Sequence, residues 1–252
     1  ASISVASQYI NDVLHNTCIQ NLHLVEVRTR NISTNTSGIN AASPVDGLTV
    51  QNCIVEGAGA SAIRVGNNSA SSFAKNIKIL NCLLVGCSNG VEIIKGSGVT
   101  ISGVHVIETS PYITNSGISV SGNSGFAIIS GNRIEMLESN TTATCISCSN
   151  NCVVQGNIVR YGETGIMVVS NLNVTGNQVF DFNSIGINVI GQKNIVSNNT
   201  IIRGYGNSGD YTSSQNTISC SASSNLFSGN LILGKNYMDK GSNNEWVNNK
   251  FE

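Results

Sequence analysis

The sequence has few charges, few prolines, few aromatic residues and no long apolar run. Only 11% of the 252 residues are charged, and the formal net charge is -1. Nucleic-acid backbones are bound by clustered lysine and arginine, and because no such cluster occurs here we expect no nucleic-acid partner. A membrane helix needs about 18 or more consecutive apolar residues, so we expect no membrane insertion either.

Residues that form turns and strands are abundant instead. The chain has 26 glycines against 2 prolines, and it is rich in asparagine and serine, which bond to their own backbone. Valine and isoleucine are also frequent and favour strands over helices. Because 40% of the residues are apolar, we expect one folded all-β domain over residues 1–252.

One segment of about eight residues recurs along the chain at intervals of 19 to 31 residues. Its first position is apolar in every copy: Ile19, Val50, Ile79, Ile101, Ile129, Val154, Val174, Val196, Phe227 and Trp246. Its sixth position is apolar as well: Leu24, Val55, Leu84, Val106, Ile134, Val159, Val179, Ile201, Ile232 and Phe251. A polar bend separates the two positions. In the last six copies the fourth position is Asn132, Asn157, Asn177, Asn199, Asn230 and Asn249, which predicts a ladder of bonded asparagine side chains.

A second motif falls between successive copies, as GVEI (90–93) and GIMV (165–168) illustrate. Its second and fourth residues are apolar, and its third points the other way in a strand. We therefore expect two strands per coil that share one core. Chains that return to the same columns every 20 to 30 residues are typical of solenoids, and this pattern predicts a right-handed parallel β-helix of about ten coils.

The eight cysteines are expected to be free thiols. The segment 145–152 (CISCSNNC) superficially resembles a metal cluster, but it contains no histidine, and Cys148 and Cys152 fall on core columns. We expect no metal and no cofactor.

Long insertions interrupt four coils at one edge, in the stretches 28–37, 109–116, 137–144 and 204–216. A fifth insertion, 66–75, leaves a different edge. A row of loops beside a flat sheet suits an extended polymer, and tyrosines suit sugar stacking. The candidate polymer-binding residues are Arg160, Tyr161, Arg203, Tyr205, Asp210 and Tyr211. The alternative is that the loops and tyrosines are decoration on the sheet edge.

Carboxylates near this edge are the candidates for acid-base chemistry: Glu135, Glu138, Glu163 and Asp181. Glycoside hydrolysis needs two carboxyl groups roughly 5 to 9.5 Å apart, and pairs from this set could meet that condition. A lyase would need a base and a cation, for which Arg160, Tyr161 and Arg203 are available. The alternative is that Asp181 with Arg203, Glu135 with Arg160, and Arg64 with Glu92 form ion pairs between coils.

The outward columns at the fifth and seventh positions of the repeat are unusually apolar, with Ile54, Leu83, Ile202 and Leu233 among them. An exposed apolar patch of this size marks an interaction surface, so we expect parallel association of three chains. The two histidines in this face, His23 and His105, are expected to be interface residues.

With its repeat (VxGNxI and GIxV) and its richness in serine, asparagine and glycine, the chain resembles the right-handed β-helix of phage tailspikes and related pectate-lyase-like proteins. The resemblance implies a homotrimeric rod in the virion tail that binds a bacterial surface polysaccharide, a capsule or O-antigen, and often hydrolyses it. The calcium-site aspartates of pectate lyases and the YPHD signature of alginate epimerases are absent. A non-enzymatic adhesin or structural spike and a polysaccharide lyase stay open as alternatives. Because the sequence starts and stops on repeat units, we expect a fragment of a longer spike.

Overall fold

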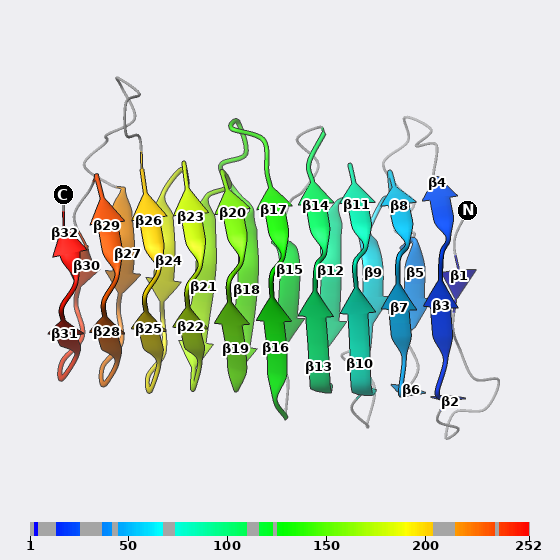
Figure 1. Cartoon of the computed structure of the whole chain (residues 1–252), viewed down its shortest axis with the longest axis horizontal. Coiled ribbons are helices and arrows are strands. Elements are labelled where there is room, and N and C mark those ends of the chain that lie inside the picture. The colour runs from blue at the N-terminus through cyan, green and yellow to red at the C-terminus, as the bar shows by residue number, and fades with distance from the viewer. Residues whose placement is uncertain are drawn as a thin grey trace.

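Each coil of the chain consists of short strands whose side chains alternate between a buried and an exposed face. The computed structural model describes residues 3–4, 14–25, 37–41, 45–67, 74–109, 116–122, 125–203, 215–234 and 237–251. All of its regular elements are strands, and among the described residues no helix is long and apolar enough to cross a membrane. Figure 1 shows the coils side by side along a rod, with the two termini at opposite ends.

The strands form three sheets, which we name A, B and C in the order in which each coil enters them. Sheet A contains β1 (Ile3–Ser4), β5 (Ile39–Ala41), β9 (Ser61–Val65), β12 (Asn89–Ile94), β15 (Ser116–Ser121), β18 (Thr144–Asn150), β21 (Thr164–Ser170), β24 (Ile185–Val189), β27 (Asn216–Cys220) and β30 (Met238–Asp239). Sheet B contains β2 (Leu14–His15), β3 (Cys18–Gln20), β6 (Val45–Asp46), β7 (Thr49–Gln51), β10 (Ala74–Leu80), β13 (Gly96–Ser102), β16 (Ala127–Ser130), β19 (Cys152–Gln155), β22 (Asn173–Thr175), β25 (Ile195–Ser197), β28 (Leu226–Ser228) and β31 (Glu245–Val247). Sheet C contains β4 (His23–Val25), β8 (Ile54–Glu56), β11 (Leu83–Val85), β14 (His105–Ile107), β17 (Arg133–Glu135), β20 (Ile158–Arg160), β23 (Gln178–Phe180), β26 (Thr200–Ile202), β29 (Leu231–Leu233) and β32 (Lys250–Phe251).

Every strand pairing among the described residues is parallel, and each strand pairs with its counterparts in the coils before and after it. The predicted right-handed parallel β-helix is confirmed. The prediction of two strands per coil is wrong, because the recurring segment is two strands and not one. Its first two residues end a strand of sheet B, and its fifth to seventh residues form a strand of sheet C.

The bend between these two strands explains the third position of the repeat. This position has a left-handed backbone in the described copies, with φ of 53° at Asn52 and 61° at Gly156. Only glycine and, at modest cost, asparagine adopt this conformation routinely. The alternation of Asn and Gly at this position therefore sets the corner between sheets B and C.

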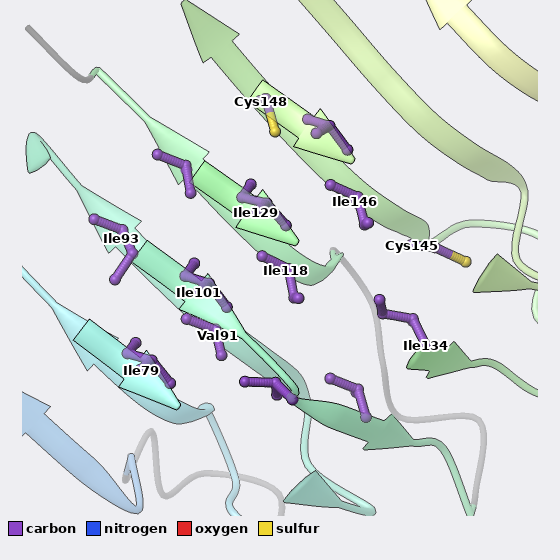
Figure 2. Close-up of a cluster of buried hydrophobic side chains, with 14 of the residues drawn as sticks. Ile79, Val91, Ile93, Ile101, Ile118, Ile129, Ile134, Cys145, Ile146 and Cys148 are labelled. Atoms are coloured by element: carbon purple, nitrogen blue, oxygen red, sulfur yellow. The ribbon is translucent and has the colours of Figure 1, made fainter. Parts of the chain in front are cut away.

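The two apolar columns predicted from the repeat line the core. Ile79, Ile101 and Ile129 from the first column are fully buried and stack above one another, as Figure 2 shows. In the sixth column Ile134 is fully buried, whereas Phe251 in the last coil is 48% exposed. The columns are thus continuous through the rod and open only near its end.

The predicted asparagine ladder is present at the corner between sheets B and C. From Asn132 to Asn249 each side-chain amide donates to the Oδ1 of the next asparagine along the column, at 2.8 to 3.0 Å. Each Oδ1 also accepts the backbone N–H of the preceding asparagine, and each amide donates a second bond to a backbone carbonyl. The ladder therefore satisfies polar groups that the closed core would otherwise leave without water.

A second, shorter ladder lies at the corner between sheets A and B. Asn194 donates to Asn225 at 3.0 Å, and Asn225 donates to Asn244 at 3.2 Å. These residues lie two positions before the first apolar position of the repeat, where earlier coils have buried apolar residues such as Ile77 and Leu172. The same change from apolar residues to asparagine occurs at both corners toward the C-terminus.

The eight cysteines are free thiols, as predicted; seven are buried and Cys18 is exposed. Burial raises the pKa of Cys82 to about 11, and it also raises the pKa of Cys145 and Cys220. The thiolate is the reactive form of cysteine. Burial therefore limits the access of a reagent to these thiols, and the raised pKa keeps them protonated. We expect native protein at pH 8 to react with a thiol reagent at Cys18 alone and urea-unfolded protein to react at all eight, which peptide mass mapping can verify. Rapid native labelling of a second cysteine would contradict this packing.

Candidate functional site

The four insertions predicted to share one edge all follow strands of the same sheet. The stretches 28–37, 109–116, 137–144 and 204–216 all connect a strand of sheet C to the next strand of sheet A, whereas 66–75 connects sheet A to sheet B. We call the first edge the C–A corner. Of its four insertions, 137–144 lies wholly within the described residues, and it shows how this corner is built.

A buried carboxylate holds the insertion after β17. Glu108, which is 4% exposed, accepts the backbone N–H of Leu137 at 2.8 Å. Its two carboxylate oxygens also accept the side-chain amide of Asn140, each at 3.0 Å. The Oδ1 of Asn140 in turn accepts the backbone N–H groups of Thr142 and Ala143. The loop is thus closed around Asn140 and fixed to the coil before it.

Asn183, from the turn after β23, holds the far side of the same loop. Its side-chain amide donates to the carbonyl of Asn140 at 2.6 Å and to the carbonyl of Glu138 at 3.1 Å. The loop after β17 therefore extends past the turn after β20 to contact the turn after β23. Hydrogen bonds thus join three successive turns at the C–A corner. These bonds between turns, together with the sheets, hold the surface of the corner in place.

Two of the candidate carboxylates project from this joined surface. Glu138 is exposed in the loop after β17, and Glu163 is exposed in the turn after β20. The backbone of Glu163 bonds to Ala143 on one side and to Ser184 on the other, at 2.8 and 2.9 Å, which fixes it between the neighbouring turns. Coils are spaced about 4.8 Å apart, a step compatible with the carboxyl separations that glycoside hydrolysis uses.

The other two candidate carboxylates are in ion pairs. Asp181 accepts a 2.8 Å bond from Nε of Arg160, and this hydrogen bond raises the pKa of the guanidinium. The same guanidinium lies over the ring of Tyr161, 4.7 Å from its centroid. Glu135 instead lies on the outer face of sheet C and pairs with Arg133 of its own strand.

The ion pairs expected between coils are therefore correct in part. Arg64 and Glu92 pair at 3.3 Å as expected. Arg160 pairs with Asp181 and not with Glu135, because its side chain extends along the rod toward the following turn while Arg133 occupies Glu135. The expected partner of Asp181, Arg203, is buried at 6% exposure with its guanidinium 5.8 Å above the ring of Phe182.

The structure thus brings Glu138, Tyr161, Glu163 and Asp181 to three neighbouring turns of one corner, with Arg160 beside them. Glu135 is not part of this group. Tyr205, Asp210 and Tyr211 fall in residues 204–214, which lie outside the described residues.

Comparison with known proteins gives one structural likeness to consider. No protein-family model matches the sequence, and no curated protein matches it. The structure is similar to that of a double mutant of the tailspike protein of E. coli bacteriophage HK620, solved in complex with a pentasaccharide. The chain has the β-helix fold of a phage tailspike. The TM-score is 0.54 at 9% sequence identity, and the match covers all of this chain and 60% of the tailspike chain, so the likeness concerns the fold.

Three residues that shape the C–A corner could not be identified from the sequence. Glu108, Asn140 and Asn183 determine the shape of the C–A corner, but they come from three different turns and follow no period. The available signal was the eighth position of the repeat, where Glu108 stands and other copies have Gly86 or Tyr161. Among the described residues no group of three or more His, Cys, Asp or Glu side chains could hold a metal ion.

Replacing Glu108 by alanine is expected to open the loop after β17. The backbone N–H of Leu137 and the side-chain amide of Asn140 would both lose their acceptor. A buried donor without an acceptor costs about 1 to 3 kcal/mol. Hydrogen exchange at the Leu137 amide should then accelerate about 10- to 100-fold. Glu138→Ala is the control, because only the backbone of Glu138 takes part in the loop's hydrogen bonds. Equal protection of Leu137 in both variants would show that Glu108 does not hold the loop.

Proposed function

We propose that this protein is the β-helix of a phage tailspike, which binds a bacterial surface polysaccharide at the C–A corner and hydrolyses it. The observation that carries the proposal is the likeness of fold to a tailspike solved with an oligosaccharide, over the full length of this chain. The location that follows is the virion tail, where the rod meets the host surface.

The geometry of the C–A corner supports binding of a polymer. Its turns repeat about every 4.8 Å along the rod, so a glycan chain laid along the corner would cross one turn at each such step. The carboxylates of Glu138, Glu163 and Asp181 lie on this path, whereas the ring of Tyr161 is partly buried, packs against the core and has the guanidinium of Arg160 over it. Glu138 and Glu163 are exposed. Pairs of carboxyl groups supply the acid and base of glycoside hydrolysis, and carboxylates also accept hydrogen bonds from sugar hydroxyls.

The outer face of sheet C supports assembly into a homotrimer. Ile158 is 37% exposed and Val25 is 47% exposed, and half-buried Leu83, Ile202 and Leu233 extend the apolar surface along the rod. His23 and His105 lie in the same face, each beside a glutamate of the next coil. Three parallel rods would cover such faces and leave the C–A corners open.

The proposal is tested by incubating the purified chain with a panel of bacterial capsular and O-antigen polysaccharides. We expect new reducing ends without absorbance near 235 nm, and a mass in solution of three times 26.4 kDa. Absorbance would mean β-elimination and a lyase in place of a hydrolase. Binding without either signal would leave a non-enzymatic adhesin. No binding to any glycan by the folded chain would refute the proposal.

A further inference from the structure

The central coils contain few positively charged residues, and in the structure both of their arginines pair with carboxylates. Between residues 96 and 192 the sequence contains no lysine, and its only arginines are Arg133 and Arg160. Arg133 bonds to Glu135 on the outer face of sheet C. Arg160 bonds to Asp181 at 2.8 Å and stacks on Tyr161. Each arginine that a ligand could reach from these coils therefore already has a carboxylate partner.

The next arginine along the C–A corner is withdrawn from the surface. Arg203, after β26, is 6% exposed, and its guanidinium lies over Phe182. The insertions 110–115 and 204–214 lie outside the described residues and contain no lysine or arginine in the sequence. The other cations in connections from sheet C to sheet A are Arg28 and Arg30, after β4, and Lys235, after β29, which also lie outside the described residues. Lys193 precedes β25, at the corner between sheets A and B and not at the C–A corner.

Negative charge at the same corner is, by contrast, available. Glu138 and Glu163 are exposed, and within the described part of the chain neither forms an ion pair. A uronate, sialate or phosphate bound beside them would lie within the screening length of about 8 Å at physiological salt, so it would be repelled. The guanidinium beside them, that of Arg160, is 51% exposed, but its charge is already offset by Asp181 at 2.8 Å.

We infer that the part of the polysaccharide accepted at the turns after β17, β20 and β23 of the C–A corner is uncharged, built from neutral and N-acetylated sugars without uronate, sialate or phosphate groups. The inference rests on the proposed function and narrows its substrate class. It also disfavours the lyase, because β-elimination from a uronate requires a cation to neutralise the sugar carboxylate. Hydroxyl and acetamido groups, which donate hydrogen bonds to carboxylates, match what Glu138, Glu163 and Asp181 offer.

The test compares neutral O-antigen polysaccharides with acidic polymers, polygalacturonate and polysialic acid, by titration calorimetry at physiological salt. The wild-type chain should bind only members of the neutral set. In 20 mM salt, Asp181→Asn should release Arg160 and tighten binding of polygalacturonate at least about tenfold over the wild type, and added salt should abolish the gain. The double variant R160Q/D181N should lose that gain, because the released cation is then absent.

Wild-type binding of an acidic polymer as tight as that of any neutral glycan would overturn the inference and leave the proposed function standing. Failure of Asp181→Asn to gain binding would also count against it, because pairing would then not be what masks Arg160. Failure of the folded wild-type chain to bind either set would instead refute the proposed function itself. Circular dichroism of each variant separates these outcomes from loss of fold.

Discussion

Asn177→Ala is expected to lower the free energy of unfolding by on the order of 4 kcal/mol. Asn177 is fully buried within the ladder, and its Oδ1 accepts both the backbone N–H and the side-chain amide of Asn157, at 3.0 and 2.9 Å. Its own amide donates to the carbonyl of Val154 and to Asn199. The truncation therefore orphans two donors and two acceptors in a closed core, and a buried polar group left unsatisfied costs about 1 to 3 kcal/mol.

The matched control is Asn173→Ala, in β22 of the same coil. Asn173 is exposed on the outer face of sheet B, so its truncation should change stability by no more than about 0.5 kcal/mol. Urea unfolding followed by circular dichroism gives both values, and unfolding rates supply the comparison if the rod unfolds irreversibly. If the two variants unfold alike, the ladder contributes no more than a surface asparagine does.

The position chosen for this test also shows how the rod tolerates variation. In the first four coils the ladder column is occupied by Leu22, Cys53, Cys82 and Val104. Val104 accommodates the change because its backbone N–H donates to Oδ1 of Asn132, the first asparagine of the ladder. Each coil contacts mainly its neighbours, as in other solenoids. A column can therefore change from apolar residues to asparagine at one coil, provided that the two residues in contact there are compatible.

Periodic features of this protein could be predicted from the sequence, and features that depend on contacts between different turns could not. The columns of Ile79 and Ile134 and the ladder through Asn177 follow from residues repeating in register, because each copy reports on the same position of the coil. The split of the recurring segment into two strands was missed since a polar bend within one strand and a corner between two sheets have the same pattern of apolar residues.

The C–A corner marks the limit of sequence-based prediction here. The sequence placed Glu138, Glu163 and Asp181 near one edge, but the direction of Arg160 depends on side-chain geometry, which periodicity does not encode. The network around Glu108 joins it to Leu137 and Asn140, which lie 29 and 32 residues further along the chain in one loop. Such bonds produce no repeating pattern in the sequence, although they determine which carboxylates are exposed to solvent and which are bound to other groups of the protein.

Glu138→Gln and Glu163→Gln are each expected to reduce glycan hydrolysis by about 10²- to 10⁴-fold, the usual contribution of a general acid or base. Glutamine keeps the shape of the side chain but can neither supply nor take up the proton. Binding should persist, because the corner is held by backbone groups of Glu138 and Glu163 that the substitution leaves in place. Turnover is measured as reducing ends, and binding by calorimetry, on the polysaccharide that the panel identifies.

Glu245→Gln is the control, because Glu245 is exposed in β31 of sheet B, away from the C–A corner. It should match the wild type in both measurements. If only one corner variant is impaired, the partner carboxylate must be Asp181, and Asp181→Asn should then lose turnover as well as gain affinity for polygalacturonate. Full turnover in both corner variants would show that neither Glu138 nor Glu163 is catalytic. Glycan binding and the charge selectivity of the corner would then have to be explained by recognition alone, because neither depends on a proton transfer.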